Sequence, residues 1–370
     1  MPAYNIEVIE AVIEKWSLKM KEETVKTLKK YSQEHLMEYL PYLTEEEQKK
    51  LEQQVEAIDF EGLQQLYELV KQKKHMEEKN ISRIPYVDKE KLDEQRKKSL
   101  EEKGKKVISS GKYAVITMAG GQGTRLGHSG PKGTYCLDTI NGPKYLFEIT
   151  VDTLKKAQKE YSVTIPWYIM TSKENNDDTI AFLEEKKYFG YDKSKVKFFT
   201  QGELPLLNTD GKVILGEDKK IKEAANGNGG IYEAIAKSGV LEELQKQEIE
   251  WIFINSMDNV LCNFVDPLFL GLTIEQNHKI ASKSVAKATP KERAGVFCKM
   301  NGKPKVIEYT ELPEEMAEEI DENGELVYGE LHIMLNLFHI SILEELANVK
   351  LPYHIAFKKS GYLGKNRRIY

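Results

Sequence analysis

The sequence predicts an α/β fold in which a mixed, mostly parallel sheet is flanked by helices, with a helical layer at the N-terminus. Three observations predict it. Short apolar segments alternate with amphipathic stretches after about residue 105. Before Gly104, glycine occurs once, at Gly62, in a region rich in Glu, Lys, Gln and Leu. A glycine-rich turn directly follows the apolar segment that ends at Met118. Strand and helix segments in alternation indicate a layered α/β domain with a mostly parallel sheet.

The N-terminal region, residues 1–104, is predicted to be helical. Thr44 and Glu47 have the spacing of a capping box at a helix start. Leu51 and Val55 follow them at the spacing of one helix face. A composition change near residue 105 separates this region from the rest, so the predicted domains are 1–104 and 105–370.

The second domain is predicted to consist of alternating strands and helices. The predicted strands are 114–118, 164–170, 196–199, 251–255 and 280–285, and the predicted helices are 146–161, 179–188, 230–238 and 267–277. Ligands of open α/β sheets bind outside the carboxyl ends of the strands. The glycine turn after Met118, Gln201 and Asp258 each follow a predicted strand end. The sequence therefore predicts one binding site at that edge.

Composition restricts the class of protein. The chain has 370 residues, 40% of them hydrophobic and 31% charged, which is typical of a soluble globular protein. Its net charge of −5 argues against sequence-independent nucleic-acid binding. No run approaches the ~20 apolar residues of a membrane span, and the N-terminus has no secretory-signal pattern. The three cysteines are far apart, so we expect a cytoplasmic protein without disulfides. No protein partner is implied.

The glycine turn has the features of a phosphate site. Gly120, Gly121 and Gly123 allow the backbone to approach a ligand and to direct N–H groups at an anion. Arg125 and Lys132 add full positive charges. The alternative is a surface loop without a ligand, but such a loop needs neither the preceding strand nor the two cations.

Two common phosphate-binding patterns do not fit. A P-loop requires Gly-Lys-Ser/Thr, whereas Lys132 lies between Pro131 and Gly133. A dinucleotide fingerprint requires Gly-x-Gly-x-x-Gly, whereas the third glycine, Gly127, comes one residue late, after Leu126. A different nucleotide-binding loop is therefore expected.

The string Ala119–Gly127, followed by Pro131 and Lys132, resembles the signature of the sugar-nucleotide pyrophosphorylases, and its continuation to Tyr135 is similar to that of the eukaryotic-type uridylyltransferases. Within this family the chain most resembles the UDP-N-acetylhexosamine pyrophosphorylases. Further blocks in the family's order are Pro166–Ser172, Tyr188–Gly190, Phe198–Pro205, Gly227–Tyr232, Asp258–Asn259, Asp266–Pro267 and Val306–Glu311. The resemblance implies a Rossmann-like nucleotidyltransferase fold of the GT-A-like type.

The resemblance also implies a reaction and a set of roles. UTP and a sugar 1-phosphate, the implied partners, would give a UDP-sugar and pyrophosphate with Mg²⁺ as cofactor. Arg125 and Lys132 would be catalytic and Asp258 would bind the metal. Gln201 would pair with the uracil edge, since an amide offers a donor and an acceptor. The other implied nucleotide-binding residues are Met118, Ala119, Gly120, Gly121 and Gly227, and the implied sugar-binding residues are Asn228, Glu308 and Tyr309.

Each role has a simpler alternative, and the resemblance has two departures. Asp258 is also suited to start a turn after a strand, and Glu308 to be a surface charge. The family's sugar-contacting Asn-Ala-Gly-Asn block corresponds to 328–336, where His332 and Ile333 replace the Gly-Asn step. Family members also continue beyond the point that matches Tyr370, so a shortened member or a fragment is expected, without the family's C-terminal part.

The predicted function is therefore a uridylyltransferase that uses UTP and, in first place, N-acetylglucosamine 1-phosphate. Glu308 and Tyr309 favour this sugar through the resemblance. The alternative with the same chemistry uses glucose 1-phosphate. The alternative from another class is a nucleotide-binding protein with weak catalysis.

Overall fold

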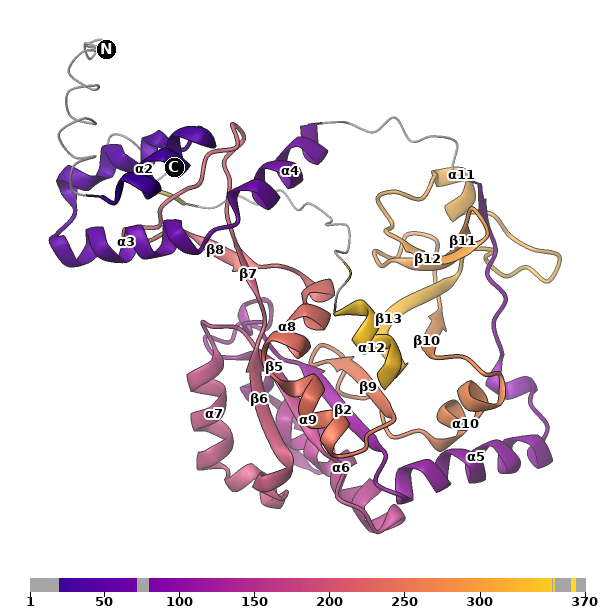
Figure 1. Cartoon of the computed structure of the whole chain (residues 1–370). Helices are drawn as coiled ribbons and strands as arrows, with labels where there is room; N and C mark the ends of the chain where they lie inside the picture. The colour runs from indigo at the N-terminus through magenta and orange to yellow at the C-terminus, as the bar shows by residue number, and fades with distance from the viewer. Residues whose placement is uncertain (1–19, 72–79, 348, 350–360, 364–370) are drawn as a thin grey trace. The chain divides into compact units, whose positions relative to one another are not determined.

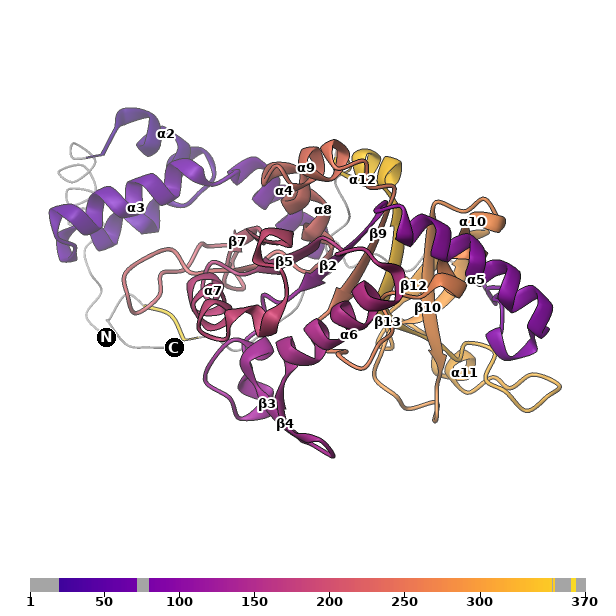
Figure 2. The same cartoon turned by 90° about the horizontal axis from the view of Figure 1, so that it is seen from below.

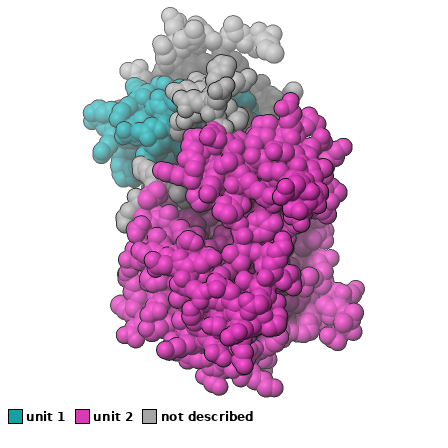
Figure 3. All heavy atoms as spheres, turned by 90° about the vertical axis from the view of Figure 1, so that its right-hand side faces the viewer, with its two compact units in different colours: residues 1–75, 203–226, 351–370 teal, residues 76–202, 227–350 magenta. Residues whose placement is uncertain are grey.

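The computed structural model describes residues 20–71, 80–347, 349 and 361–363. The chain divides into two compact units, which Figure 3 colours separately. Unit 1 comprises residues 1–75, 203–226 and 351–370, and unit 2 comprises residues 76–202 and 227–350. The sequence places a domain boundary between residues 104 and 105, but this position lies inside the helix α5 (Glu94–Ser109). The whole of α5 belongs to unit 2, because it packs against a later helix of that unit.

Unit 1 is mainly helical, as the composition of its first segment predicts. Its described elements are α2 (Glu22–Lys30), a 3₁₀ helix (Glu34–Tyr42), α3 (Glu45–Ala57), α4 (Phe60–Lys71), β7 (Glu203–Pro205) and β8 (Glu223–Ala225). The capping box is confirmed: Glu47 N donates to Thr44 Oγ1 (3.3 Å), and Thr44 N donates to Glu47 Oε2 (2.7 Å). Val213 and Leu215 share a buried cluster with Leu28 and Leu51. The segment 203–226 therefore belongs to this unit by its apolar contacts.

Unit 2 contains a mixed sheet of nine strands among the described residues. Its main path runs β1-β11-β13-β9-β2-β5-β6, with β10 beside β13 and β12 beside β11. The parallel strands are β2 (Tyr113–Met118), β5 (Trp167–Thr171), β6 (Val196–Thr200) and β9 (Trp251–Ser256). The antiparallel strands are β1 (Ile81–Ser82), β10 (Ile280–Ala286), β11 (Val296–Met300), β12 (Lys303–Ile307) and β13 (Glu330–His339). The α/β prediction is confirmed, and its parallel part is the β6-β5-β2-β9 half of the sheet.

Helices cover both faces of the sheet (Figures 1 and 2). Figure 2 shows α6 (Leu146–Tyr161) on one face and α8 (Ile231–Lys237), α9 (Val240–Lys246) and α12 (Ile340–Leu346) on the other. The other α-helices and strands of the described part of unit 2 are α7 (Asn176–Glu185), α10 (Pro267–Glu275), α11 (Glu314–Ala317) and a hairpin of β3 (Cys136–Thr139) and β4 (Gly142–Tyr145). Helix α6 has the bounds that the sequence predicts.

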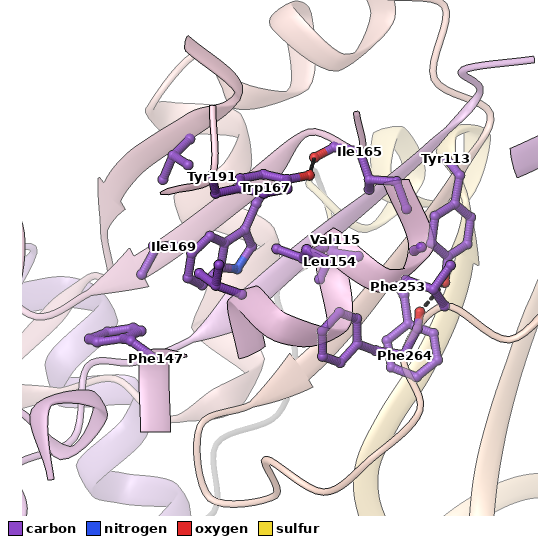
Figure 4. Close-up of a cluster of buried hydrophobic side chains, with 14 of the residues drawn as sticks. Tyr113, Val115, Phe147, Leu154, Ile165, Trp167, Ile169, Tyr191, Phe253 and Phe264 are labelled. Atoms are coloured by element: carbon purple, nitrogen blue, oxygen red, sulfur yellow. Dashed lines mark hydrogen bonds between the residues drawn. The ribbon is translucent and has the colours of Figure 1, made fainter. Parts of the chain in front are cut away.

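Two apolar cores lie on opposite faces of the sheet because side chains alternate along each strand. In β2, Tyr113 and Val115 join the core under α6, whereas Ala114 and Ile116 join the core under α8 and α9. Figure 4 shows the first core, in which the Tyr113 hydroxyl donates to the Phe264 carbonyl. All six side chains of β2 are buried. This double burial holds the strand that leads into the glycine turn.

Helices α5 and α10 approach each other through two glycines. A Cβ atom at Gly104 would lie 2.0 Å from the Pro267 carbonyl oxygen, and one at Gly271 would lie 1.8 Å from the Leu100 carbonyl oxygen. Both distances are far below van der Waals contact. Glycine at these two positions therefore permits the close helix pair. Among the described residues, no helix combines the length and apolar character that a membrane span requires.

Candidate functional site

The glycine turn is a closed loop at the carboxyl end of β2. Ala119 N donates to the Met170 carbonyl at the end of β5 (2.7 Å). Within the loop, Gly123 N donates to Gly130 O (2.9 Å), and Lys132 N donates to Gly121 O (3.0 Å). These bonds fold residues 119–132 back on themselves, and they fix the loop at the edge where the sequence predicts a ligand.

Gln201 lies against this loop, as the strand-end argument predicts. Its backbone N–H donates to the Thr171 carbonyl at the end of β5 (2.8 Å). A Cβ atom at Gly120 would lie 2.7 Å from Gln201 Nε2. The structure therefore brings Gly120 and Gln201 together, and glycine at position 120 makes room for the amide side chain.

Lys132 and Asp258 form an ion pair across two strand ends. The Lys132 ammonium contacts Asp258 Oδ1, and Met257 N donates to the Met118 carbonyl (3.0 Å). The lysine side chain is 16% exposed, whereas the Asp258 side chain is 65% exposed. A cation and a carboxylate, which the sequence places 126 residues apart, thus meet beside the loop. The carboxylate stays open to solvent.

Arg125 lies on the outer part of the loop. It belongs to a short 3₁₀ helix (Thr124–Leu126), which ends at Gly127 with a left-handed φ of 69°. Its side chain is exposed, and no described residue forms an ion pair with it. The guanidinium is therefore available for an anionic ligand.

The residues expected at the sugar occupy two places. Gly227 has a φ of 85° and precedes the turn Asn228–Gly230 that leads into α8. The Asn228 amide nitrogen lies 3.9 Å from the Met334 sulfur on β13. Glu308 and Tyr309 follow β12 and are exposed, Tyr309 by 44%. No contact between described residues joins Glu308 or Tyr309 to the glycine loop, so their place in the site stays a prediction.

Strand β13 lies between these two groups. Met334 has a left-handed φ of 58°, and the pairing with β10 shifts register between Ser282 and Ser284. His332 Nε2 lies 3.3 Å from Asn336 Oδ1. Burial lowers the pKa of His332, although the Asn336 hydrogen bond and the Glu308 charge oppose this shift. The Glu308 charge therefore acts on His332 of β13, the strand whose Met334 contacts Asn228.

The donor set of the site is compatible with Mg²⁺. Among the described residues, no group of three or more His, Cys, Asp or Glu side chains gathers as a metal site. Mg²⁺ is commonly bound by one or two carboxylates together with substrate phosphates and water. The single exposed carboxylate of Asp258 fits that mode and does not fit a site made of protein ligands alone.

Sequence reasoning missed a buried residue beneath the loop. Asn175, which is fully buried, donates from Nδ2 to the Ala119 carbonyl (3.0 Å) and the Gly121 carbonyl (3.4 Å). Its Oδ1 accepts from Ser172 N (2.9 Å). The available signal was a serine and an asparagine three residues apart after a strand, a spacing typical of a side-chain-stabilised turn.

The chain is similar to known proteins over most of its length. A family model described as UTP–glucose-1-phosphate uridylyltransferase matches residues 59–357, which is more than half of the chain. The chain belongs to this family. The resemblance inferred from the sequence motifs is thereby confirmed.

Relatives that are 30–35% identical to this chain are named for N-acetylglucosamine. A probable UDP-N-acetylglucosamine pyrophosphorylase of Dictyostelium discoideum is 35% identical over 347 residues, covering 88% of this chain and 71% of the relative. UDP-N-acetylglucosamine diphosphorylase 2 of Arabidopsis thaliana is 35% identical, covering 90% and 70%. The solved uridine diphosphate N-acetylglucosamine pyrophosphorylase of Trypanosoma brucei is 30% identical, with a TM-score of 0.74, covering 87% of this chain and 67% of that one.

Proposed function

We propose that this chain transfers the uridylyl group of UTP to N-acetylglucosamine 1-phosphate and releases pyrophosphate, with Mg²⁺ as cofactor. The observation that carries the proposal is the Lys132–Asp258 pair beside the glycine loop in a chain of this family. The names of the relatives at about 35% identity support the choice of sugar.

The chemistry requires charge stabilisation rather than proton transfer. A phosphate oxygen of the sugar phosphate forms a bond to the α-phosphorus of UTP, and the bond from that phosphorus to pyrophosphate breaks. The attacking oxygen is already an anion, so no general base is needed. Arg125 and Lys132 would stabilise the negative charge that develops on the leaving pyrophosphate.

The ion pair prepares the site for a charged substrate. Without nucleotide, the Lys132 ammonium and the Asp258 carboxylate partly neutralise each other. A bound triphosphate offers the ammonium a second anionic partner, and Asp258 would then hold Mg²⁺. When bound, the metal supplies positive charge to the phosphate oxygens.

The remaining roles follow the family resemblance and the observed positions. Gln201 would pair with the uracil edge, because it lies on Gly120 at the loop. The other proposed nucleotide contacts are Met118, Ala119, Gly121 and Gly227. The proposed sugar contacts are Asn228, Glu308 and Tyr309.

The second candidate uses glucose 1-phosphate. One observation favours it: the matching family model is itself described as UTP–glucose-1-phosphate uridylyltransferase. The chemistry at the phosphates is the same, so the two candidates differ in the sugar contacts alone.

One assay set tests the proposal. The protein is incubated with UTP and Mg²⁺ and either N-acetylglucosamine 1-phosphate or glucose 1-phosphate, and pyrophosphate release is followed. Faster release with the N-acetylated sugar supports the proposal, whereas faster release with glucose 1-phosphate supports the second candidate. Release with neither sugar, while UTP still raises the melting temperature, would favour a nucleotide-binding protein with weak catalysis.

We also propose a cytoplasmic location. Its support is that Cys136, Cys262 and Cys298 are unpaired in the structure, which suits a reducing compartment. Cell fractionation with an antibody to the protein tests it.

A further inference from the structure

The glycine loop presents backbone N–H groups that bind nothing else in the protein. Within the part of the chain that the structure describes, the N–H groups of Gly120, Gly121 and Gln122 donate to no protein acceptor. A Cβ atom at Gly121 would lie 3.6 Å from the Lys132 ammonium nitrogen. Backbone N–H groups without a protein acceptor, in a loop that also contacts an ammonium group, are suited to an anion.

Asn175 contacts the peptide groups of two of these N–H groups, and the second of the two is also held by the bond from Lys132 N to the Gly121 carbonyl. A trans peptide is planar, and its C=O and N–H bonds point in opposite directions. Asn175 Nδ2 donates to the carbonyls of Ala119 and Gly121, which belong to the same peptide groups as the N–H of Gly120 and the N–H of Gln122. Both N–H groups therefore point away from Asn175.

The amide of Asn175 is itself held in one orientation. Its Oδ1 accepts from Ser172 N (2.9 Å), and its backbone N–H donates to Ser172 Oγ (3.2 Å). If the Oδ1 and Nδ2 atoms of Asn175 exchanged places, the nitrogen would face the Ser172 N–H and the oxygen would face two carbonyls. The side chain would then lose all its hydrogen bonds, because a backbone N–H can only donate and a carbonyl can only accept. The side chain is fully buried, so bulk water does not reach it as a substitute partner.

We propose that Asn175 is a positioning residue that holds the Gly120–Gln122 backbone with its N–H groups toward the triphosphate of the nucleotide. This inference rests on the proposed function, which supplies the triphosphate. Asn175 touches no substrate in this proposal; it acts through the loop backbone. Its loss would leave the Ala119 carbonyl free to turn and would remove one of the two hydrogen bonds to the Gly121 carbonyl, which also accepts from Lys132 N (3.0 Å). The anion site would then be less well preorganised.

The test replaces Asn175 by an apolar residue of similar shape. Asn175→Leu is compared with the wild-type protein for binding of UTP in the presence of MgCl₂ by calorimetry. We expect affinity to fall by ~10-fold, which corresponds to about 1.4 kcal/mol. Asn175→Ala is measured in parallel, so that a result is obtained if the leucine variant fails to fold.

A matched control lies next in the chain. Asn176 accepts from Thr171 Oγ1 (2.8 Å) and donates to Asp177 Oδ1 (3.0 Å), without a described contact to the loop. Asn176→Leu and Asn176→Ala should therefore bind UTP like the wild type, even if their melting temperatures fall. This separates a loop effect from a general loss of stability.

A spectroscopic readout follows the loop directly. In protein labelled with [¹⁵N]glycine, the amide signals of Gly120 and Gly121 should shift on addition of UTP and MgCl₂ in the wild type and the Asn176 variants. In the Asn175 variants at equal nucleotide saturation, the shift of Gly120 should be clearly smaller than in the wild type, because its N–H no longer faces the phosphates; Gly121, whose peptide group Asn175 does not contact, is the internal reference for these shifts. A structural role without a positioning effect would leave them unchanged.

The outcomes separate this inference from the proposed function. If folded Asn175 variants bind UTP as tightly as the wild type, with the same glycine shifts, the positioning role is overturned while the proposed function stands. If the wild type binds UTP but turns over no sugar phosphate, the transferase activity fails and the positioning role is still supported by weaker binding in the variants. If the wild type binds no UTP, both are overturned.

Discussion

The parallel and antiparallel halves of the unit 2 sheet carry their functional groups in different ways. In the parallel half, every side chain of β2 and β5 is buried, and the candidate site residues follow the ends of the strands. In the antiparallel half, β10 has no buried side chain, and its Ser282 donates to Asn336 on the face of β13 (2.6 Å). The parallel half is thus a rigid support for a site at its edge, whereas the antiparallel half places polar groups along its strands.

This difference separates two tasks in the proposed reaction. The loop, Gln201 and Asp258 lie at the carboxyl ends of neighbouring parallel strands, and in the proposed reaction they would form the nucleotide and metal part of the site. Glu308 and Tyr309 are exposed at the end of β12, and they belong to the proposed sugar part. We therefore expect substitutions in the first group to reduce turnover, and substitutions in the second to change the choice of sugar.

The largest expected effect comes from the loop cation. Arg125→Ala should lower kcat by ~10²-fold or more, because a cation that stabilises the leaving pyrophosphate is lost. The melting temperature should stay near that of the wild type, since the side chain is exposed and has no ion-pair partner among the described residues. Steady-state kinetics and thermal melting measure both quantities.

The control for that experiment is Lys159→Ala, which removes an exposed cation from the last turn of α6. It should leave kcat unchanged. Near-normal turnover of Arg125→Ala would remove this residue from the mechanism and would weaken the contrast between the two halves.

The metal ligand is the second test of the parallel half. Asp258→Asn should raise the Mg²⁺ concentration needed for half-maximal activity by ~10-fold, because an amide binds a hard cation more weakly than a carboxylate does. Activity is measured over a Mg²⁺ titration at fixed UTP. An unchanged metal dependence would count against Asp258 as the ligand. Asp178→Asn, in the first turn of α7, is a control that should not change the titration.

The third test concerns the helices beside the core. Gly104→Ala should lower the free energy of unfolding by ~1–3 kcal/mol, because the new Cβ would meet the Pro267 carbonyl and push α5 and α10 apart. Denaturant unfolding measures the change. Lys106→Ala, on the exposed side of α5, is the control and should have little effect. Equal stability of Gly104→Ala and the wild type would show that the helix pair adapts without cost.

The smallest expected effect lies in the antiparallel half. Burial lowers the pKa of His332 in the folded chain, so between that pKa and ~6.5 the unfolded chain binds more protons than the folded one. Stability from this group is therefore present above ~pH 6.5 and is lost as the pH falls through the folded pKa. His332→Gln should flatten the decline of the melting temperature below that pH. Parallel curves for the two proteins would contradict this role of His332.

The features predicted correctly from the sequence are those that depend on residues close together in the chain. The capping box at Thr44 and Glu47, and helix α6 from Leu146 to Tyr161, depend on residues within a few positions, and both were predicted correctly. The strand-end rule likewise predicted that Gln201 would lie at the loop. Asn175 was missed because its importance depends on the carbonyls of a loop more than 50 residues earlier. The antiparallel strand β13 was missed because its place depends on pairing with β9, β10 and β11.

The sequence by itself determined the family, the parallel strands and the position of the glycine loop after β2, because glycine clusters and apolar runs are signals that depend on neighbouring residues. The tertiary structure alone decided that Lys132 meets Asp258, that Asn175 holds the loop, and that residues 203–226 join the N-terminal unit. These are contacts between distant segments. Packing and pairing of whole elements decide such contacts, and a single sequence does not record their geometry.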